Sequence, residues 1–459
     1  MVPSHAGDLI GQVPPSPAGP IGVDEAATLP LPPEVNLPKA LQVMRFSVRQ
    51  IEFVFGGRRR HGEVFRFNGV VPGKPAVTGH PDHVRSLFTA KPELAPSLTG
   101  ESPLRPILGA GSVLTSLGAR HMRQRKLLLP PFHGESVARY VQMIEDVTER
   151  ELATWPVGEA FASAPRMQAI TLDVIMAGIF GIEGRPTAGT PEHQLRGATK
   201  SLTAASSKPF AQLAELLNLG RTEPVGLTKL GMRMIDRPTY AIIAARRRAA
   251  DLDERSDILS MLMRARTEEG EALSDRELRD ELLTLVLAGH ETTANQLAWT
   301  WERLVRNPAA YDRLRDAVRS GDEAVADAEV EAVINESMRS RPVIPVIGRR
   351  VQVPWRLGAY SVPAGSPISM SILLLHHRDD LYPDPFAFRP ERWHGHKPGT
   401  YEWIPFGGGT RRCLGATLAM AEQRVVLREM ARRLDLEAVD PEPEHALHRN
   451  VTMIPAQGG

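Results

Sequence analysis

One long helix constrains the fold of this chain more than any other feature. The segment LSDRELRDELLTLVLAGHETTANQLAWTWERLVRNP places Ser274 and Glu277 at the spacing of a capping box, and Asn307-Pro308 ends the helix. About 32 residues at ~1.5 Å each predict a rod of roughly 48 Å. Its centre, TLVLAG, is apolar on all sides, so we expect the rod to be buried.

Polar residues follow directly on this apolar centre: Gly289, His290, Glu291, Thr292 and Thr293. A glycine inside a helix costs ~1 kcal/mol relative to alanine, and a buried acid or hydroxyl needs a partner. Two interpretations are open. Either a threonine donates to the carbonyl four residues earlier and the glutamate pairs with an arginine, or the helix turn is widened beside a ligand. We assign His290 no catalytic role.

The only cysteine of the chain, Cys413, lies in the segment FGGGTRRCLG, residues 406–415. A lone cysteine forms no internal disulfide, and a single thiolate is a poor basis for a structural zinc site. Glycines precede it, which permit close backbone approach, and a helical pattern follows it. The helix N-terminus, Arg411 and Arg412 favour the thiolate, a nucleophile or metal ligand. The alternative is a small buried apolar side chain.

The spacing of this segment, F-x-x-G-x-R-x-C-x-G, resembles the haem-thiolate signature of the cytochrome P-450 superfamily. Four further segments occur in the order typical of that family: HMRQR, AGHET, ESMR and PERW. The resemblance spans roughly residues 36–459. In PERW the tryptophan, Trp393, replaces the usual phenylalanine.

The resemblance implies that the chain binds haem b, with Cys413 as the axial ligand of the iron. No C-x-x-C-H occurs, so we expect no covalent attachment of the haem through thioethers. Either Arg349 or its neighbour Arg350 is expected to reach a propionate. The full set of residues expected to contact the haem is His121, Arg125, Ala288, Arg349, Phe406, Gly407, Arg411 and Gly415.

The resemblance also implies roles for two further groups of residues. Glu291 and Thr292 would organise water and deliver protons to bound oxygen. Glu336 and Arg339 form an E-x-x-R pair that would join Arg392 in a structural network bracing the cysteine loop.

The fold implied is mainly α with a minor β-sheet, the triangular-prism architecture of the cytochrome P-450 fold. Haem would lie between the AGHET helix and the helix after Cys413. Residues 1–35, rich in proline and glycine, are expected to be a disordered or extended tail, and residues 36–459 a single domain. We expect a helix from residue 38 to Gly56-Gly57, strands at 63–67 and 74–79, and a mobile lid within 205–226.

Composition limits the possible functions. The chain has 459 residues and a formal net charge of +1, which gives no case for nucleic acid. No apolar run reaches about 18 residues, and the N-terminus lacks the pattern of a signal peptide. A single cysteine fits the reducing cytoplasm, so we expect the protein to be cytoplasmic. We also expect it to be a monomer.

We expect a monooxygenase that inserts one oxygen atom from O₂ into an apolar small molecule such as a lipid, fatty acid, steroid or terpenoid. The chain has no room for a fused redox domain, so a ferredoxin and its NAD(P)H-dependent reductase would supply electrons. The ferredoxin would dock on a basic face formed by Arg120, Arg123, Lys126, Arg412 and Arg424. Two alternatives stay open: a haem-thiolate isomerase or dehydratase that does not activate O₂, and a non-enzymatic haem or lipid carrier.

Overall fold

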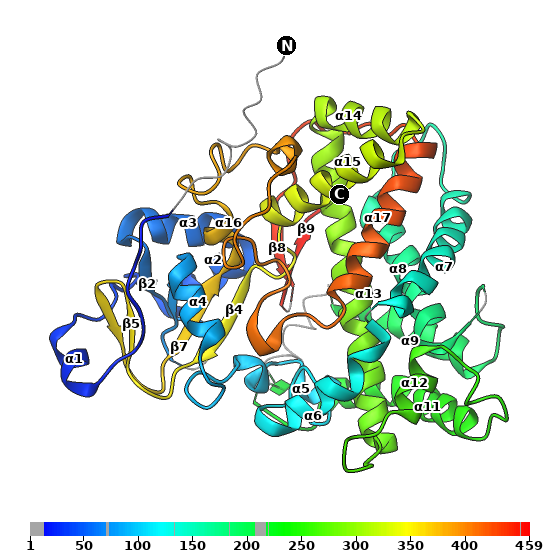
Figure 1. The fold of residues 1–459 in the computed structure, drawn as a ribbon, viewed down its shortest axis with the longest axis horizontal. Coiled ribbons are helices and arrows are strands. Elements are labelled where there is room, and N and C mark those ends of the chain that lie inside the picture. The colour runs from blue at the N-terminus through cyan, green and yellow to red at the C-terminus, as the bar shows by residue number, and fades with distance from the viewer. Residues whose placement is uncertain are drawn as a thin grey trace.

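The long helix predicted from the sequence is α13 (Asp275–Val305), which crosses the middle of the molecule (Figure 1). Its capping box is present: Ser274 accepts from the backbone N–H of Glu277, and the Glu277 side chain accepts from Ser274. The helix ends before Asn307, as expected. It packs most extensively against α8 (Ser163–Phe180) and also contacts α15 (Glu323–Ser340) and α17 (Ala416–Arg433).

The structure is a computed structural model that describes residues 13–69, 73–132, 134–182, 184–206, 217–218, 220–449 and 451–459. Residues 207–216 and 219, half of the proposed lid at 205–226, lie outside these residues. The other helices are α1 (Val23–Thr28), α2 (Lys39–Val48), α3 (Gln50–His61), α4 (Pro81–Thr89), α5 (Arg105–Leu108), α6 (Gly118–Leu128), α7 (Glu135–Leu152), α9 (Pro191–Ser206), α11 (Gly226–Arg247), α12 (Ile258–Arg264), α14 (Pro308–Arg319) and α16 (Ile372–His376).

In the described part of the chain, three small sheets accompany the helices. The largest has the order β2-β3-β7-β4, built from β2 (Val64–Arg66), β3 (Ala76–Thr78), β7 (Pro367–Ser371) and β4 (Val346–Arg350). In it β3 and β7 are parallel, whereas the other pairs are antiparallel. A second sheet has the order β1-β5-β6, from β1 (Ala18–Pro20), β5 (Trp355–Leu357) and β6 (Tyr360–Val362). The hairpin of β8 (Ala446–Arg449) and β9 (Thr452–Pro455) forms the third.

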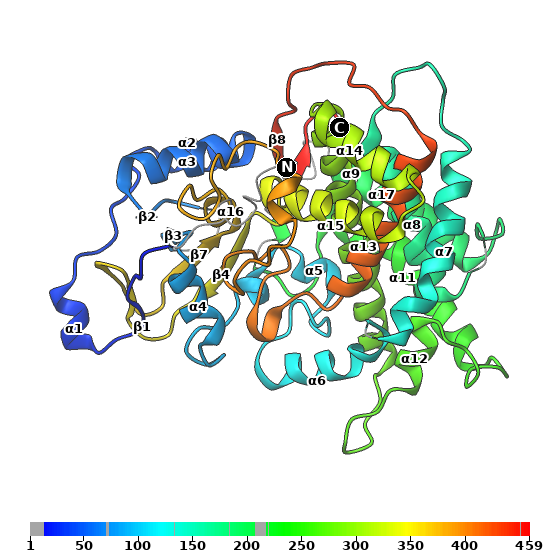
Figure 2. The same ribbon diagram turned by 45° about the horizontal axis from the view of Figure 1, so that its top comes forward.

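The mainly α-helical fold with a minor sheet is confirmed. Helices α7, α8, α13 and α17 gather on one side of the molecule, and the larger sheet lies with α2, α3 and α4 on the other side (Figures 1 and 2). The predicted strands at 63–67 and 74–79 correspond to β2 and β3. Within the described residues, no helix is both long enough and apolar enough to cross a lipid bilayer.

Two expectations about the N-terminal part were wrong. The helix from residue 38 is two helices, because the backbone leaves helical geometry at Arg49. The second one, α3, continues through Gly56 and Gly57 to His61. A Cβ on Gly57 would lie 2.5 Å from ring atoms of Phe65. This glycine therefore lets α3 pack closely on β2 and does not end the helix.

Residues 13–35 also differ from the expected tail. From Ala18 they contain β1, which pairs with β5, and α1; Glu34 bridges to Arg66. Backbone pairing with a distant strand orders this segment despite its composition, which is a contact that composition cannot reveal. Residues 1–12 lie outside the described residues.

Candidate functional site

The cysteine loop packs tightly on α4 through its glycines. Cys413 lies between a 3₁₀ turn (Gly409–Arg411) and α17, and its backbone N–H donates to the carbonyl of Phe406 at 2.9 Å. Gly407 and Gly409 have φ of 67° and 62°. A Cβ on Gly409 would lie 2.4 Å from the carbonyl oxygen of Phe88. The glycines therefore permit both the turn and the close approach that the sequence predicted.

The surroundings of the Cys413 thiol differ from the expectation in one respect. Cys413 is accessible to solvent on one side, but protein atoms surround it on most other sides. This partial burial raises the pKa of the thiol. The backbone N–H of Gly415 and the guanidinium groups of Arg125 and Arg412 act in the opposite direction but do not outweigh burial. The chain alone thus favours the thiol, and a bound metal ion would have to stabilise the thiolate.

Four nitrogen-bearing side chains from three elements converge near this loop. They are His121 and Arg125 of α6, Arg349 of β4, and Arg411 of the 3₁₀ turn. Burial and neighbouring arginines lower the pKa of His121 to about 4, so this imidazole is neutral at pH 7. Burial lowers the pKa of Arg349 to about 10. Burial and the charges of Arg349 and Arg125 lower the pKa of Arg411 to about 10.

No carboxylate of the described residues forms an ion pair with Arg125, Arg349 or Arg411. Arg125 donates to the carbonyl of Arg412 at 2.8 Å, and Arg349 donates to that of Gly348 at 3.1 Å. Arg411 donates to the carbonyls of residues 113, 114 and 116. Because cations withdrawn from water need compensating charge, the buried Arg349 and the half-buried Arg125 and Arg411 fit a ligand with more than one carboxylate, as haem b with its two propionates has.

The neighbouring Arg350 has a different partner. Its guanidinium forms two hydrogen bonds of 2.7 Å with the carboxylate of Glu101. Arg349 instead lies over the ring of Phe88, with 5.7 Å from guanidinium carbon to ring centre, and is buried. Of the two residues left open by the sequence, the contacts therefore favour Arg349 as the one available to a propionate.

The polar centre of α13 is locally satisfied. The Thr292 hydroxyl donates to the carbonyl of Ala288 at 2.5 Å, and the Glu291 carboxylate pairs with Arg449 of β8 at 2.6 Å. A Cβ on Gly289 would lie 2.6 Å from the Ile175 side chain, so the glycine permits close packing of α8. The helix is continuous here, and the widened turn is not observed. Ala288 is nevertheless exposed on a helix whose flanking turns are buried.

The predicted network around Glu336 is present in full. Its carboxylate accepts from Arg339 at 2.7 and 2.8 Å and lies 3.1 Å from the Arg392 guanidinium; all three side chains are fully buried. Trp393 adds a hydrogen bond of 3.0 Å from its indole nitrogen to Glu336. This bond was not foreseen, because the tryptophan was expected to act only as a substitute for phenylalanine.

Sequence reasoning missed two acidic residues near the N-terminal end of α13. Asp280 accepts from the backbone N–H of Gly111 at 2.9 Å, and Glu281 accepts from that of Val113 at 2.8 Å. They fix the loop whose carbonyl groups hold Arg411. Two adjacent acids at the start of an apolar helix segment were the available signal.

A surface hollow of about 290 Å³ lies elsewhere, between α2 and α3. None of the predicted site residues lines it. The chemistry of the side chains, not the size of a hollow, therefore locates the candidate site at Cys413.

Comparisons with known proteins bear on the family and the fold of this chain. The family model described as "Cytochrome P450" matches residues 31–458. "Putative cytochrome P450 137" of Mycobacterium tuberculosis is 37% identical over 449 residues, covering 93% of this chain and 90% of the relative. "Putative cytochrome P450 138" of Mycobacterium bovis is 37% identical over 430 residues, covering 94% and 95%.

A solved structure, "Retinoic acid bound cyanobacterial CYP120A1", has the same fold. It superposes with a TM-score of 0.78 at 22% sequence identity, and the match covers 94% of this chain and 98% of that one. This likeness confirms the prism-shaped helical architecture expected from the sequence.

Proposed function

Because this chain belongs to the cytochrome P450 family, we propose that it inserts one atom of O₂ into an apolar small molecule, a lipid, fatty acid, steroid or terpenoid, with electrons from separate redox proteins. The family carries out haem-thiolate monooxygenation with haem b. The bound haem supplies oxygen activation, which an axial thiolate assists.

One observation carries the assignment of the haem site. Cys413 is the only cysteine of the chain, and its loop faces three arginines that have no carboxylate partner among the described residues. Cys413 would ligate the iron, and Arg125, Arg349 and Arg411 would hold the propionates. His121, neutral at pH 7, would act as a hydrogen-bond donor and not as a charge.

The other expected haem contacts have supporting positions. The backbone N–H of Gly415 bonds to the cysteine sulfur and would moderate its charge. Gly407 leaves room for Ile347, whose terminal carbon would lie 3.2 Å from a Cβ on this glycine. Phe406 packs against the main hydrophobic core, and Ala288 offers an exposed face of α13.

Thr292 is the better placed of the two proposed proton-delivery residues. Its hydroxyl proton is directed to the Ala288 carbonyl, so its oxygen is available to accept a hydrogen bond from water. Two guanidinium nitrogens of Arg449 donate to the Glu291 carboxylate, at 2.9 and 2.6 Å. To relay a proton into the site, Glu291 would first have to exchange this partner for water.

Electrons would come from a ferredoxin and its NAD(P)H-dependent reductase. The chain has one cysteine, and an iron–sulfur cluster needs several. The docking face is smaller than the sequence suggested, because Arg123 pairs with Glu271 and Glu277, Lys126 pairs with Glu268, and Arg424 pairs with Glu331. Arg120 and Arg412 form no ion pair with a described residue, so the proposed contact centres on these two.

The spectrum of the reduced, carbon-monoxide-bound protein tests the haem assignment. We expect the red-shifted Soret band of thiolate ligation, and its loss in Cys413→Ser. A globin-like band from freshly prepared wild-type protein would disprove the ligand assignment.

Turnover with a surrogate ferredoxin and reductase tests the reaction. Oxygenated product would exclude both the isomerase and the carrier. Docking through Arg412 predicts that Arg412→Glu slows reduction without changing substrate-induced shifts of the haem spectrum. An unchanged reduction rate would place the donor elsewhere.

A further inference from the structure

Helix α2 is packed in an unusual way. Its only fully buried residue is a polar one, Gln42, which donates to the carbonyls of Val35 and Leu37 at 3.1 and 2.6 Å. Two of its apolar residues, Met44 and Val48, expose 54% and 53% of their surface. They lie four residues apart, on one face of the helix. An ordinary amphipathic helix of a globular protein buries its apolar face, so this face is available to be covered by something else.

Arginines without partners surround the same helix. Arg45 and Arg49 lie at the end of α2, and Arg59 and Arg60 at the end of α3. Each is exposed, and none forms a side-chain hydrogen bond or ion pair with a described residue. Elsewhere exposed arginines are frequently paired, as Arg424 is with Glu331.

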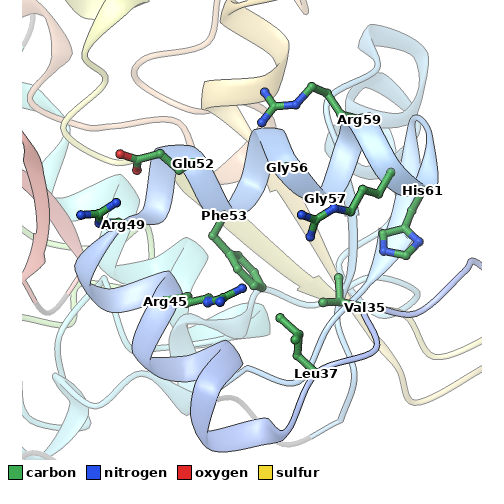
Figure 3. Close-up of a pocket in the computed structure, with 11 residues that line it drawn as sticks. Val35, Leu37, Arg45, Arg49, Glu52, Phe53, Gly56, Gly57, Arg59 and His61 are labelled. Carbon is green, nitrogen blue, oxygen red and sulfur yellow. The ribbon is translucent and has the colours of Figure 1, made fainter.

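These arginines belong to the rim of the hollow of about 290 Å³ between α2 and α3 (Figure 3). Apolar side chains, Val35, Leu37 and Phe53, also line the hollow. Glu52 is its only acidic lining residue. The α2–α3 surface, defined as Met44, Arg45, Val48, Arg49, Arg59 and Arg60 with this hollow, is therefore basic and apolar at once, on a chain whose net charge is only +1.

We propose that the α2–α3 surface docks on an anionic lipid bilayer. Lipid phosphates pair well with guanidinium groups, often through two hydrogen bonds. The acyl region immediately beneath them takes up apolar side chains such as Met44 and Val48. An acidic protein would neutralise the arginines but would also need an apolar patch matched to both helices. A bilayer offers both environments in adjacent layers, which is the combination that this surface presents.

The test is flotation of the full chain with lipid vesicles. We expect binding to vesicles of phosphatidylcholine mixed with phosphatidylglycerol, and little binding to phosphatidylcholine alone. Added salt should weaken the binding, because the screening length falls from about 10 Å at 0.1 M to about 3 Å at 1 M salt. Equal binding to both kinds of vesicle, or none to either, would overturn the proposal.

Two double variants separate the contributions of charge and apolar contact. Arg45→Gln/Arg49→Gln should lower the partition coefficient about fivefold per arginine, the equivalent of about 1 kcal/mol each at an anionic surface. Met44→Ser/Val48→Ser keeps the charge and should also weaken binding. If only the arginine variant has an effect, the apolar side chains do not enter the lipid and the proposed mode of docking is wrong.

A matched control removes the same charge far from this surface. Arg150 of α7 and Lys200 of α9 are exposed, and their helices lie on the opposite side of the molecule (Figures 1 and 2). Arg150→Gln/Lys200→Gln should bind the mixed vesicles as wild type does. An equal loss in this control would show that net charge, not the α2–α3 surface, drives binding. Because flotation does not depend on haem or turnover, its result is separate from that of the proposed function.

Discussion

Replacing Glu336 with alanine removes the only carboxylate among the described residues that compensates two buried guanidinium groups. In the wild type it accepts from Arg339 at 2.7 and 2.8 Å, from the backbone N–H of Arg389 at 2.8 Å and from Trp393 at 3.0 Å, and it lies 3.1 Å from Arg392. The side chains of Glu336, Arg339 and Arg392 are 0% exposed, so water cannot replace the lost partner without disrupting the packing.

The size of the effect follows from this burial. Leaving a buried charge without its partner costs about 3–5 kcal/mol, whereas whole domains are stable by only about 5–15 kcal/mol. Arg339 would keep its bonds to the carbonyls of His376, Pro385 and Ala387. These bonds do not supply negative charge, so we expect Glu336→Ala to lose most of its margin of stability and to retain little haem.

Urea unfolding followed by far-ultraviolet circular dichroism measures this loss, and haem absorbance measures cofactor retention. Glu331→Ala is the matched control, because Glu331 lies on the same helix but forms an exposed pair with Arg424 at 2.6 Å. Its expected cost is at most about 1 kcal/mol. Trp393→Phe removes one bond to a charged acceptor and should fall between the two, at about 1.5–3 kcal/mol. The reasoning is refuted if the free energies of unfolding of Glu336→Ala and Glu331→Ala differ by less than about 1 kcal/mol, the upper limit for a surface ion pair.

Three further predictions concern the haem site and pH. Thr292→Ala should keep the haem spectrum but divert reducing equivalents to peroxide or water; unchanged coupling of NAD(P)H use to product would contradict its role. Arg349→Leu should weaken haem retention, whereas Arg350→Leu, which removes the pair with Glu101 and the bond to the Gly365 carbonyl, should retain haem as the wild type does; equal retention would disprove the distinction. Burial raises the pKa of Glu422 from 4.5 to about 8, so its contribution to stability is complete below pH 4.5 and is lost as pH rises through 8. Glu422→Gln should therefore unfold at higher urea than wild type at pH 9 but not at pH 4, and parallel pH profiles would refute this.

Local signals explain which parts of the fold could be predicted. The boundaries of α13 follow from a capping box and an Asn-Pro pair, which act within a few residues of the helix ends. Gly56 and Gly57 misled the prediction for α3, because the role of Gly57 depends on Phe65 in a different element. The N-terminal segment is likewise ordered by its pairing with β5. Ala18 lies opposite Leu357, more than about 300 residues later in the sequence. Contacts of this kind leave no trace in local composition.

The candidate site shows the same limit. The resemblance pointed to Cys413, Arg411 and the Glu336 network, because their spacing can be recognised in the sequence alone. It did not reveal that Arg350 forms an ion pair with Glu101, or that Glu291 forms one with Arg449. These pairs join segments that only the folded chain brings together. Nor did the charges near the cysteine loop show which basic residues already have acidic partners.

The loop of residues 109–116 explains how acidic and basic groups coexist at this site. On one side its N–H groups at 111 and 113 donate to Asp280 and Glu281. On the other side its carbonyls at 113, 114 and 116 accept from Arg411. The peptide groups thus bond to both kinds of charge and keep them apart, so the carboxylates do not neutralise the arginine. Burial raises the pKa of both Asp280 and Glu281, which reduces their negative charge further. The positive charge of Arg411 would thereby remain available to the anionic ligand that we propose.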